Sequence, residues 1–283
     1  VEQDIRYLQG GLSAWQWEKK STQADPKITP MQLKGAIDHG KINKEIFLLD
    51  VREPDEFSSW NIEGSRNIPL SQIPNSLDRI PKDSKNKKVV TICPAGNRSS
   101  IATLLLQQLG FHKVKTLEGG LKSWSSTYEH IIQKFVVKGG KKVRLVQIRR
   151  IGKGCLSYIL EADYEAAVID PVFPIDDYIK IAEGDGMKAK INKVFDTHLH
   201  ADHVSAARKL AEKVNAQLYL SSYEEEYETN VIYNASELDD GDILMIGSVP
   251  VKIIYSPGHT RGSVSLLIGH KLLFTGVHCS LII

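Results

Sequence analysis

A dense group of potential metal ligands is the sequence feature that most constrains how this chain can fold. Four such side chains fall within six residues: His198, His200, Asp202 and His203. A predicted strand at 190–196 precedes them and a predicted helix at 204–214 follows. Alternate residues of an extended segment project to one side, so His198 and His200 can reach one metal ion. Asp202 and His203, at the turn into the helix, can serve an adjacent position. A chance polar loop explains this density of ligands poorly.

A fifth candidate ligand, His259, lies on the turn Ser256-Pro257-Gly258-His259-Thr260 after a predicted strand at 250–255. A histidine on such a turn, taken alone, is more often exposed to solvent. Beside the first motif, a ligand is the favoured interpretation. The other histidines that have no comparable neighbours are interpreted as surface residues: His39, His112, His130 and His270.

A cysteine loop, 93–99, lies between a predicted buried strand at 88–93 and a predicted helix at 99–109. It reads Cys93-Pro94-Ala95-Gly96-Asn97-Arg98-Ser99. A loop that leads into a helix N-terminus directs backbone N–H groups inward and adds the positive end of the helix dipole, which stabilises a thiolate. Gly96 lets the backbone curl around the sulfur, and Arg98 adds a fixed positive charge. The loop therefore predicts a cradle for a persulfide on Cys93, whose outer sulfur a nucleophile attacks.

Two other interpretations of the loop stay open. Cys93 can be a buried structural cysteine at the end of a strand, which is how we interpret Cys155. A cysteine loop ending in arginine also suits a phosphatase. The length from Cys93 to Arg98 and the surrounding sequence favour sulfur over phosphate.

The length and composition fit two soluble domains. The chain has 283 residues, of which 42% are hydrophobic and 25% charged, with a net charge of +2. A domain usually takes roughly 100–200 residues. The weak charge gives no field that would select nucleic acid or acidic lipid, and no apolar run approaches the ~20 residues that span a bilayer. Three scattered cysteines are not a disulfide framework and fit a reducing cytoplasm.

Short apolar runs define the first half. Those at 46–51, 88–93 and 114–117 alternate with helices, one of them opened by Thr29-Pro30, which predicts an open parallel α/β sheet. From residue 143 onward strands dominate. Antiparallel strands are predicted at 143–148, 154–160 and 166–169, and further strands at 190–196, 217–221, 250–255 and 263–268.

An internal similarity links the start of the chain to its middle. Residues 5–15 (IRYLQGGLSAW) match 114–124 (VKTLEGGLKSW) at a Leu, a Gly-Gly pair, a second Leu and a Trp. We interpret residues 1–17 as the tail of a preceding copy of the first domain. Together with the missing initiator Met, this predicts that the chain is a piece of a longer protein. Residues 18–27 are polar and are expected to form a linker.

Residues 28–128 resemble a rhodanese domain. The matching motifs are Leu49-Asp50-Val51-Arg52-Glu53, Ile62-Glu63-Gly64-Ser65-Arg66-Asn67-Ile68-Pro69, the cysteine loop, and Leu117-Glu118-Gly119-Gly120-Leu121-Lys122-Ser123-Trp124. The resemblance implies an open parallel sheet with flanking helices, with Cys93 as the sulfur carrier in a loop that runs to Arg98. Asp50 and Arg52 are expected to hold the fold together. A linker is expected at 129–142.

Residues 143–276 resemble the metallo-β-lactamase fold, through Thr197-His198-Leu199-His200-Ala201-Asp202-His203, Pro257-Gly258-His259-Thr260 and Leu272-Leu273-Phe274-Thr275-Gly276. The resemblance implies an α+β domain, an αββα sandwich, of which 143–283 is the N-terminal part. Within the fold the motifs are most similar to persulfide dioxygenases, which implies a single Fe(II) with His198 and His259 as ligands. The alternative is a glyoxalase II-type thioesterase, which implies two metals, with Zn(II) the alternative to iron.

Position 277 departs from the family pattern. Both interpretations of the domain require an aspartate directly after Gly276, and this sequence has Val277, which cannot coordinate a metal. We expect truncation or a reading-frame error near this position, which leaves the domain incomplete at its C-terminus. A minority hypothesis is that His278 or Cys279 replaces the missing ligand.

The sequence thus predicts a sulfur-metabolism enzyme in which Cys93 transfers persulfide sulfur and a metal-dependent domain oxidises a low-molecular-weight persulfide. One alternative is a metal-dependent thioester hydrolase joined to a sulfurtransferase. Another is a sulfurtransferase whose metal domain is catalytically incomplete. The expected partners are small sulfane-sulfur donors and thiol acceptors such as glutathione, with no nucleic acid and no membrane.

Overall fold

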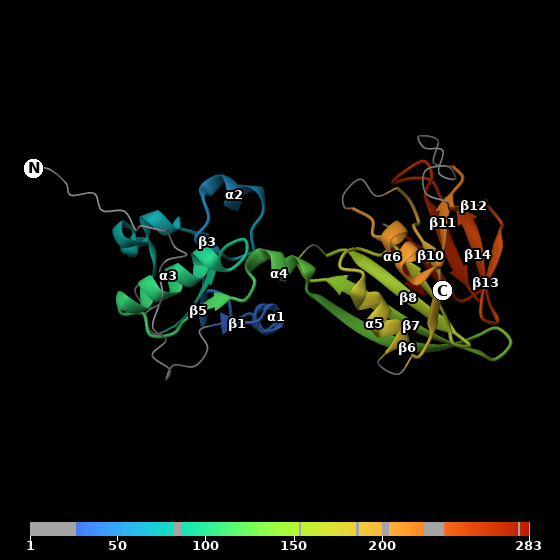
Figure 1. Ribbon diagram of the computed structural model, residues 1–283, viewed down its shortest axis with the longest axis horizontal. Coiled ribbons are helices and arrows are strands. Elements are labelled where there is room, and N and C mark those ends of the chain that lie inside the picture. The colour runs from blue at the N-terminus through green and yellow to red at the C-terminus, as the bar shows by residue number, and fades with distance from the viewer. Residues whose placement is uncertain are drawn as a thin grey trace, which may run out of the picture. The chain divides into compact units, whose positions relative to one another are not determined.

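The computed structural model describes residues 27–81, 87–152, 154–184, 187–199, 204–223 and 235–276, and the backbone of 278–282. The chain divides after Gly120 into two compact units (Figure 1). The repeat tail expected at 1–17 lies outside the described residues, as does the linker expected at 18–27 except for its last residue. In the described part, no helix is both long and apolar enough to cross a bilayer.

The first unit is built on a five-stranded parallel sheet in the order β1-β5-β4-β2-β3. Its strands are β1 (Lys27–Ile28), β2 (Ile46–Asp50), β3 (Arg66–Asn67), β4 (Lys88–Ile92) and β5 (Val114–Leu117). Its helices are α1 (Pro30–Asp38), α2 (Pro54–Ser59) and α3 (Asn97–Gln108), with 3-10 turns at η2 (Leu70–Asn75) and η3 (Leu77–Arg79). Helix α4 (Gly120–Ser126) follows β5. The predicted open parallel sheet is confirmed.

The central strands of the first unit are continuous apolar runs because they lie in its core. All of β2 is buried, and β4 is buried after its first residue. Helix α3 packs Ala102 and Leu106 into the same cluster as Leu49 and Val89. Each apolar side chain buried in this way contributes about 1.5–3 kcal/mol relative to its exposed state. The strands are thus fixed in the sheet, and the loops that follow them carry the candidate chemistry.

The second unit contains two sheets. A seven-stranded sheet has the order β12-β11-β10-β9-β8-β7-β6, antiparallel from β6 to β9 and parallel from β9 to β12. Its strands are β6 (Tyr128–Val137), β7 (Lys141–Arg150), β8 (Leu156–Ala162), β9 (Glu165–Ile169), β10 (Lys190–Phe195), β11 (Gln217–Ser221) and β12 (Ser236–Leu238). An antiparallel sheet contains β13 (Ile243–Ile246), β14 (Val249–Tyr255), β15 (Val264–Ile268), β16 (Leu272–Thr275) and β17 (His278–Ile282).

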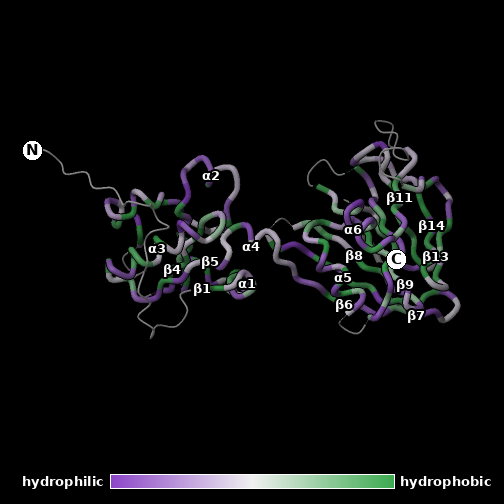
Figure 2. Tube along the Cα trace, viewed as in Figure 1, coloured by the Kyte–Doolittle hydropathy of each residue, from purple (hydrophilic) through white to green (hydrophobic). Residues whose placement is uncertain are grey.

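Two apolar clusters fill the second unit, one on each face of the seven-stranded sheet. One joins that sheet to the antiparallel sheet through residues such as Leu160, Phe195 and Leu266. The other packs helices α5 (Asp176–Glu183) and α6 (Ala207–Val214) against the opposite face. In Figure 2 the tube is coloured as hydrophobic along parts of β8, β9 and β14. The order of layers is helices, sheet, sheet, and the structure describes no helix after α6.

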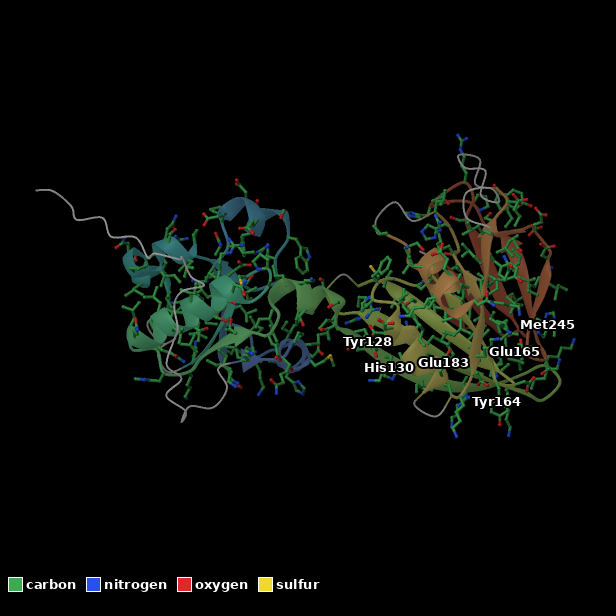
Figure 3. All side chains as sticks on the ribbon, in the orientation of Figure 1. Tyr128, His130, Tyr164, Glu165, Glu183 and Met245 are labelled. Atoms are coloured by element: carbon green, nitrogen blue, oxygen red, sulfur yellow. The ribbon has the colours of Figure 1, made fainter. Side chains whose placement is uncertain are left out.

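Residues 129–142, which the sequence led us to expect as a linker, form strand β6 and a turn. Strand β6 pairs with β7 in unbroken antiparallel register, from Tyr128 opposite Arg150 to Val137 opposite Lys141. At the sheet edge, Ile131 and Ile132 remain 59% and 46% exposed. The strand therefore lacks the alternation of apolar and polar residues that marks a half-buried strand. Figure 3 labels Tyr128 and His130 at its start, where their rings lie 5.9 Å apart.

Candidate functional site

Cys93 directly follows β4, where the chain turns into α3. Its side chain is only 1% exposed. The Gly96 N–H donates a hydrogen bond to the Cys93 Sγ at 3.1 Å, and the Ser99 Oγ lies 3.3 Å from the same sulfur. Gly96 has a φ of +98°, a conformation that an L side chain rarely adopts. The backbone therefore curls around the sulfur with one N–H directed at it.

The other residues of the loop differ in their exposure to solvent. Ser99 is fully buried, whereas Ala95 and Asn97 are exposed and Pro94 is half-buried. Asn97 is the first residue of α3. The loop thus holds a buried sulfur beside exposed loop residues.

The Gly-Gly pair at 119–120 packs against the cysteine loop. Gly120 has a φ of +59°, and a Cβ there would lie 2.2 Å from the carbonyl oxygen of Cys93 and 2.8 Å from the amide nitrogen of Ala95. Both contacts are with backbone, which cannot move aside cheaply. The first residue of α4 must therefore be glycine for the loop to keep this shape.

Arg98 points its guanidinium at Glu56. Two parallel hydrogen bonds join them, each of 2.7 Å. The Glu53 N–H also donates to the Glu56 carboxylate. The hydrogen bonds from Arg98 are the main reason that the pKa of Glu56 falls from its ordinary 4.5 to about 2. Glu56 therefore balances the positive charge beside the sulfur. No sequence motif named above includes Glu56, although its spacing of three residues from Glu53, typical of a capping box, was a usable signal.

Asp50 and Arg52 form a buried ion pair. The Arg52 Nε lies 3.0 Å from both carboxylate oxygens of Asp50, and its Nη2 donates to Asp50 at 2.8 Å. The same guanidinium donates to the carbonyl oxygens of Glu56 and Trp60. These contacts tie the end of β2 to α2. They fit the structural role expected from the sequence.

In the second unit, His198 follows β10 and is 4% exposed. Its Nδ1 lies 2.9 Å from the Thr197 Oγ1, which is in turn 2.9 Å from a carboxylate oxygen of Asp170. An ionised carboxylate only accepts hydrogen bonds, so the Thr197 hydroxyl donates to Asp170 and accepts from the His198 Nδ1–H. This arrangement places the lone pair of the ring on Nε2, the form that a metal ligand requires.

The structure brings His259 next to His198. Their ring centroids are 5.0 Å apart and the rings are nearly perpendicular, at 87°. A backbone hydrogen bond of 2.9 Å from the Val264 N–H to the Thr197 carbonyl fixes the two segments together. This pair of imidazoles fits two ligands of one metal ion in chemistry and position.

The other predicted ligands, His200, Asp202 and His203, lie outside the described residues. Among the residues that are described, no group of three or more His, Cys, Asp or Glu side chains could hold a metal ion. The pair His198 and His259 is thus the part of the predicted ligand set whose geometry is visible.

Gly276 lies against the support of His198. A Cβ at Gly276 would be 2.7 Å from the Thr197 Oγ1 and 3.5 Å from the His198 Nδ1. Position 277 thus directly follows a residue that packs against Thr197 and His198. Val277 and the side chains of His278 and Cys279 lie outside the described residues, so replacement of the missing carboxylate stays a hypothesis.

Family models match both halves of the chain. Residues 29–127 match the rhodanese-like domain, and residues 150–276 match the metallo-beta-lactamase superfamily. The chain therefore belongs to the rhodanese-like domain family over its first half and continues into a metallo-beta-lactamase superfamily domain.

Individual relatives resemble one half each. A sulfurtransferase of Allochromatium vinosum is 34% identical over 82 residues, which cover 29% of this chain and 74% of that protein. The probable polyketide biosynthesis zinc-dependent hydrolase PksB of Bacillus subtilis is 31% identical over 137 residues, which cover 48% of this chain and 60% of that protein. The structure of ETHE1 from Myxococcus xanthus is 24% identical, with a TM-score of 0.39 and coverage of 51% of this chain and 56% of that one.

The chain spans only part of several of these relatives. It covers 60% of the length of PksB and 33% of a beta-lactamase hydrolase-like protein of Xylella fastidiosa.

Proposed function

We propose that this chain is a sulfur-metabolism enzyme that carries sulfane sulfur on Cys93 and oxidises a low-molecular-weight persulfide in its metal-dependent domain. The observation that carries the proposal is the position of the Cys93 sulfur, buried at a strand-to-helix turn with the Gly96 N–H 3.1 Å away. A sulfur held in this way is stabilised as an anion. The membership of the rhodanese-like domain family supports the same chemistry.

The sulfur transfer has two balanced steps. The Cys93 thiolate attacks the sulfane sulfur of a donor, the bond between that sulfur and the rest of the donor breaks, and the remainder leaves with the electron pair. An acceptor thiolate, such as glutathione, then attacks the outer sulfur of the Cys93 persulfide and regenerates the Cys93 thiolate. Arg98, whose charge Glu56 pairs, would stand at the edge of the loop, held in one orientation by its two hydrogen bonds.

In the second unit, His198 and His259 would hold the metal ion, together with ligands from His200, Asp202 and His203. A metal bound there supplies vacant coordination positions if it is Fe(II), or a Lewis acid if it is Zn(II). Thr197 and Asp170 would keep the His198 ring oriented, with its Nδ1 proton pointing away from the metal. The fusion itself supports persulfide as the shared compound, because one unit forms it and the other would consume it.

The proposal is tested with the intact chain loaded with Fe(II). We expect oxygen uptake with glutathione persulfide, and its loss in His198→Ala. We also expect thiosulfate–cyanide sulfurtransferase activity, and its loss in Cys93→Ser. Equal sulfurtransferase activity in the parent and in Cys93→Ser would remove this cysteine from the mechanism.

Two other functions have specific support. The likeness to PksB favours a zinc-dependent hydrolase. Hydrolysis of an acylglutathione by the Zn(II)-loaded chain, without oxygen uptake by the Fe(II)-loaded chain, would select the thioesterase.

Val277 favours a sulfurtransferase with an incomplete metal domain. Sulfurtransferase activity with neither oxygen uptake nor thioester hydrolysis would select that function. In each case we place the enzyme in the cytoplasm.

A further inference from the structure

A cluster of four buried hydroxyl groups lies behind Cys93. Thr91 comes from β4, Thr116 from β5, and Ser99 and Thr103 from α3; none of these residues is more than 3% exposed. Strands β4 and β5 are otherwise apolar where they are buried. A buried hydroxyl costs free energy unless it is hydrogen-bonded, and valine would fill the same space in a strand without that cost. Four hydroxyls in one buried cluster, one of them next to the sulfur, therefore call for an explanation beyond packing.

The hydrogen bonds in the cluster lead toward the sulfur. The Thr116 hydroxyl donates to the Ser99 Oγ at 2.6 Å, and the Ser99 Oγ lies 3.3 Å from the Cys93 Sγ. The Thr91 hydroxyl lies 3.3 Å from the Thr116 Oγ1 and 2.8 Å from the Thr103 Oγ1, so Thr103 is the member of the cluster farthest from the sulfur along these hydrogen bonds. Since Thr116 donates to it, the Ser99 oxygen keeps a partner whichever way its own proton points.

Ser99 can change the direction of its proton at little cost. With Cys93 as a thiol, the S–H donates to the Ser99 Oγ, and the Ser99 hydroxyl donates to the Gly96 carbonyl at 3.0 Å. That carbonyl also accepts hydrogen bonds from the Ser100 N–H and the Ser100 hydroxyl, at 2.9 and 2.8 Å. The Gly96 carbonyl therefore keeps its two hydrogen bonds from Ser100 when the Ser99 hydroxyl rotates away from it.

We propose that Thr116 and Ser99 form a hydrogen-bond relay that stabilises Cys93 in its anionic forms. When Cys93 loses its proton to water, the Ser99 hydroxyl rotates from the Gly96 carbonyl to the sulfur and donates to it. Thr116 continues to donate to Ser99, which makes the Ser99 hydroxyl a stronger donor. Thr116 is thus a positioning residue that acts on the sulfur through Ser99. The relay deepens the proposed function, because it rests on Cys93 being the sulfur carrier.

The test measures how fast iodoacetamide alkylates Cys93 in the intact chain as a function of pH, with each cysteine peptide resolved by mass spectrometry. A hydrogen bond to a charged group is worth enough to move a thiol midpoint by about one pH unit or more. We expect Thr116→Val and Ser99→Ala to raise the Cys93 midpoint by that amount. Thr116→Ser, which keeps the hydroxyl, should restore the midpoint of the parent.

Two matched controls separate the relay from a loss of packing. Thr103→Val removes a hydroxyl from the same cluster but outside the relay, and Ser100→Ala removes the other hydroxyl on the Gly96 carbonyl. We expect both to leave the midpoint unchanged. An unchanged midpoint in folded Ser99→Ala, or an equal shift in Thr103→Val, would overturn the relay.

The alkylation readout requires no sulfur donor, so the two proposals fail separately. A midpoint shift in a chain without sulfurtransferase activity would support the relay and reject the proposed function. If the parent has sulfurtransferase activity but neither Ser99→Ala nor Thr116→Val changes the Cys93 midpoint, the proposed function is supported and the relay is rejected.

Discussion

Thr197 determines which nitrogen of His198 carries the lone pair. Its hydroxyl lies between the Asp170 carboxylate and the His198 Nδ1, at 2.9 Å from each. Thr197→Val keeps the shape and removes the hydroxyl. Loss of such a partner typically lowers metal affinity by about 10–100-fold, and we expect that range here, measured by competition with a chelator. Thr197→Ser should bind like the parent, and equal affinity in Thr197→Val would contradict the orienting role.

The lowered pKa of Glu56 predicts how the stability of the fold depends on pH. Its pKa is lowered from 4.5 to about 2, so its ion pair with Arg98 stabilises the fold fully above about pH 4.5 and loses this effect as the pH falls toward 2. The pair is partly exposed, which limits its contribution to about 0.5–1 kcal/mol. Urea unfolding should show Glu56→Gln less stable than the parent by that amount at pH 7. The difference should shrink below pH 4.5, and a constant difference down to pH 2 would count against the ion pair.

At the scale of elements, the contact between α4 and the cysteine loop is the most sensitive to one added atom. Gly120→Ala must displace the backbone at Cys93 and Ala95, whereas a Cβ added at Gly110, which has a φ of +87°, would meet nothing within 4 Å. We expect Gly110→Ala to cost about 1 kcal/mol from its backbone conformation alone. Gly120→Ala should cost more in urea unfolding and also slow Cys93 alkylation. Equal effects of the two substitutions would show that the contact is not needed.

The elements that the sequence predicted well are those whose residues carry a local signal. Strands β2, β4 and β5 are short apolar runs, and Thr29 opens α1 with both hydrogen bonds of a capping box. By contrast, α5, β12, β13 and β17 have no counterpart among the predicted elements. The sequence predicts a linker where strand β6 forms, because the exposed position of this strand at a sheet edge leaves no apolar pattern to detect.

The parts of the candidate sites that lie within one continuous motif could be predicted from the sequence. The cysteine loop and the histidine loop are contiguous, so their spacing predicts their chemistry. Glu56 and Thr116 lie 42 and 17 residues from the partners that they bind, Arg98 and Ser99. Only the parallel sheet brings these segments together, and a single sequence does not reveal the pairing. A threonine within a buried apolar strand was the local hint for Thr116, and the spacing of three residues from Glu53 was the hint for Glu56.

At the scale of the whole molecule, each unit has its own apolar core. Asp50→Asn breaks the buried pair with Arg52, which costs about 3–5 kcal/mol when one partner of such a pair is lost. Hydrogen exchange with mass spectrometry should show faster exchange in β2, β4 and β5, and unchanged exchange in β8, β9 and β10. Equal acceleration in both sets would show that the units unfold together.

Strand β6 limits where the chain can be cut into separately expressed fragments. The sequence suggests a cut within 129–142, yet that cut would remove up to ten residues that pair along the whole of β7. A Cβ at Gly152 would lie 2.7 Å from the Ser125 Cα and 2.9 Å from the Trp124 ring, so even α4 belongs partly to the second unit. An expression fragment of the second unit should therefore begin before Trp124. The two proposed activities are best separated by inactivating point substitutions rather than by scission.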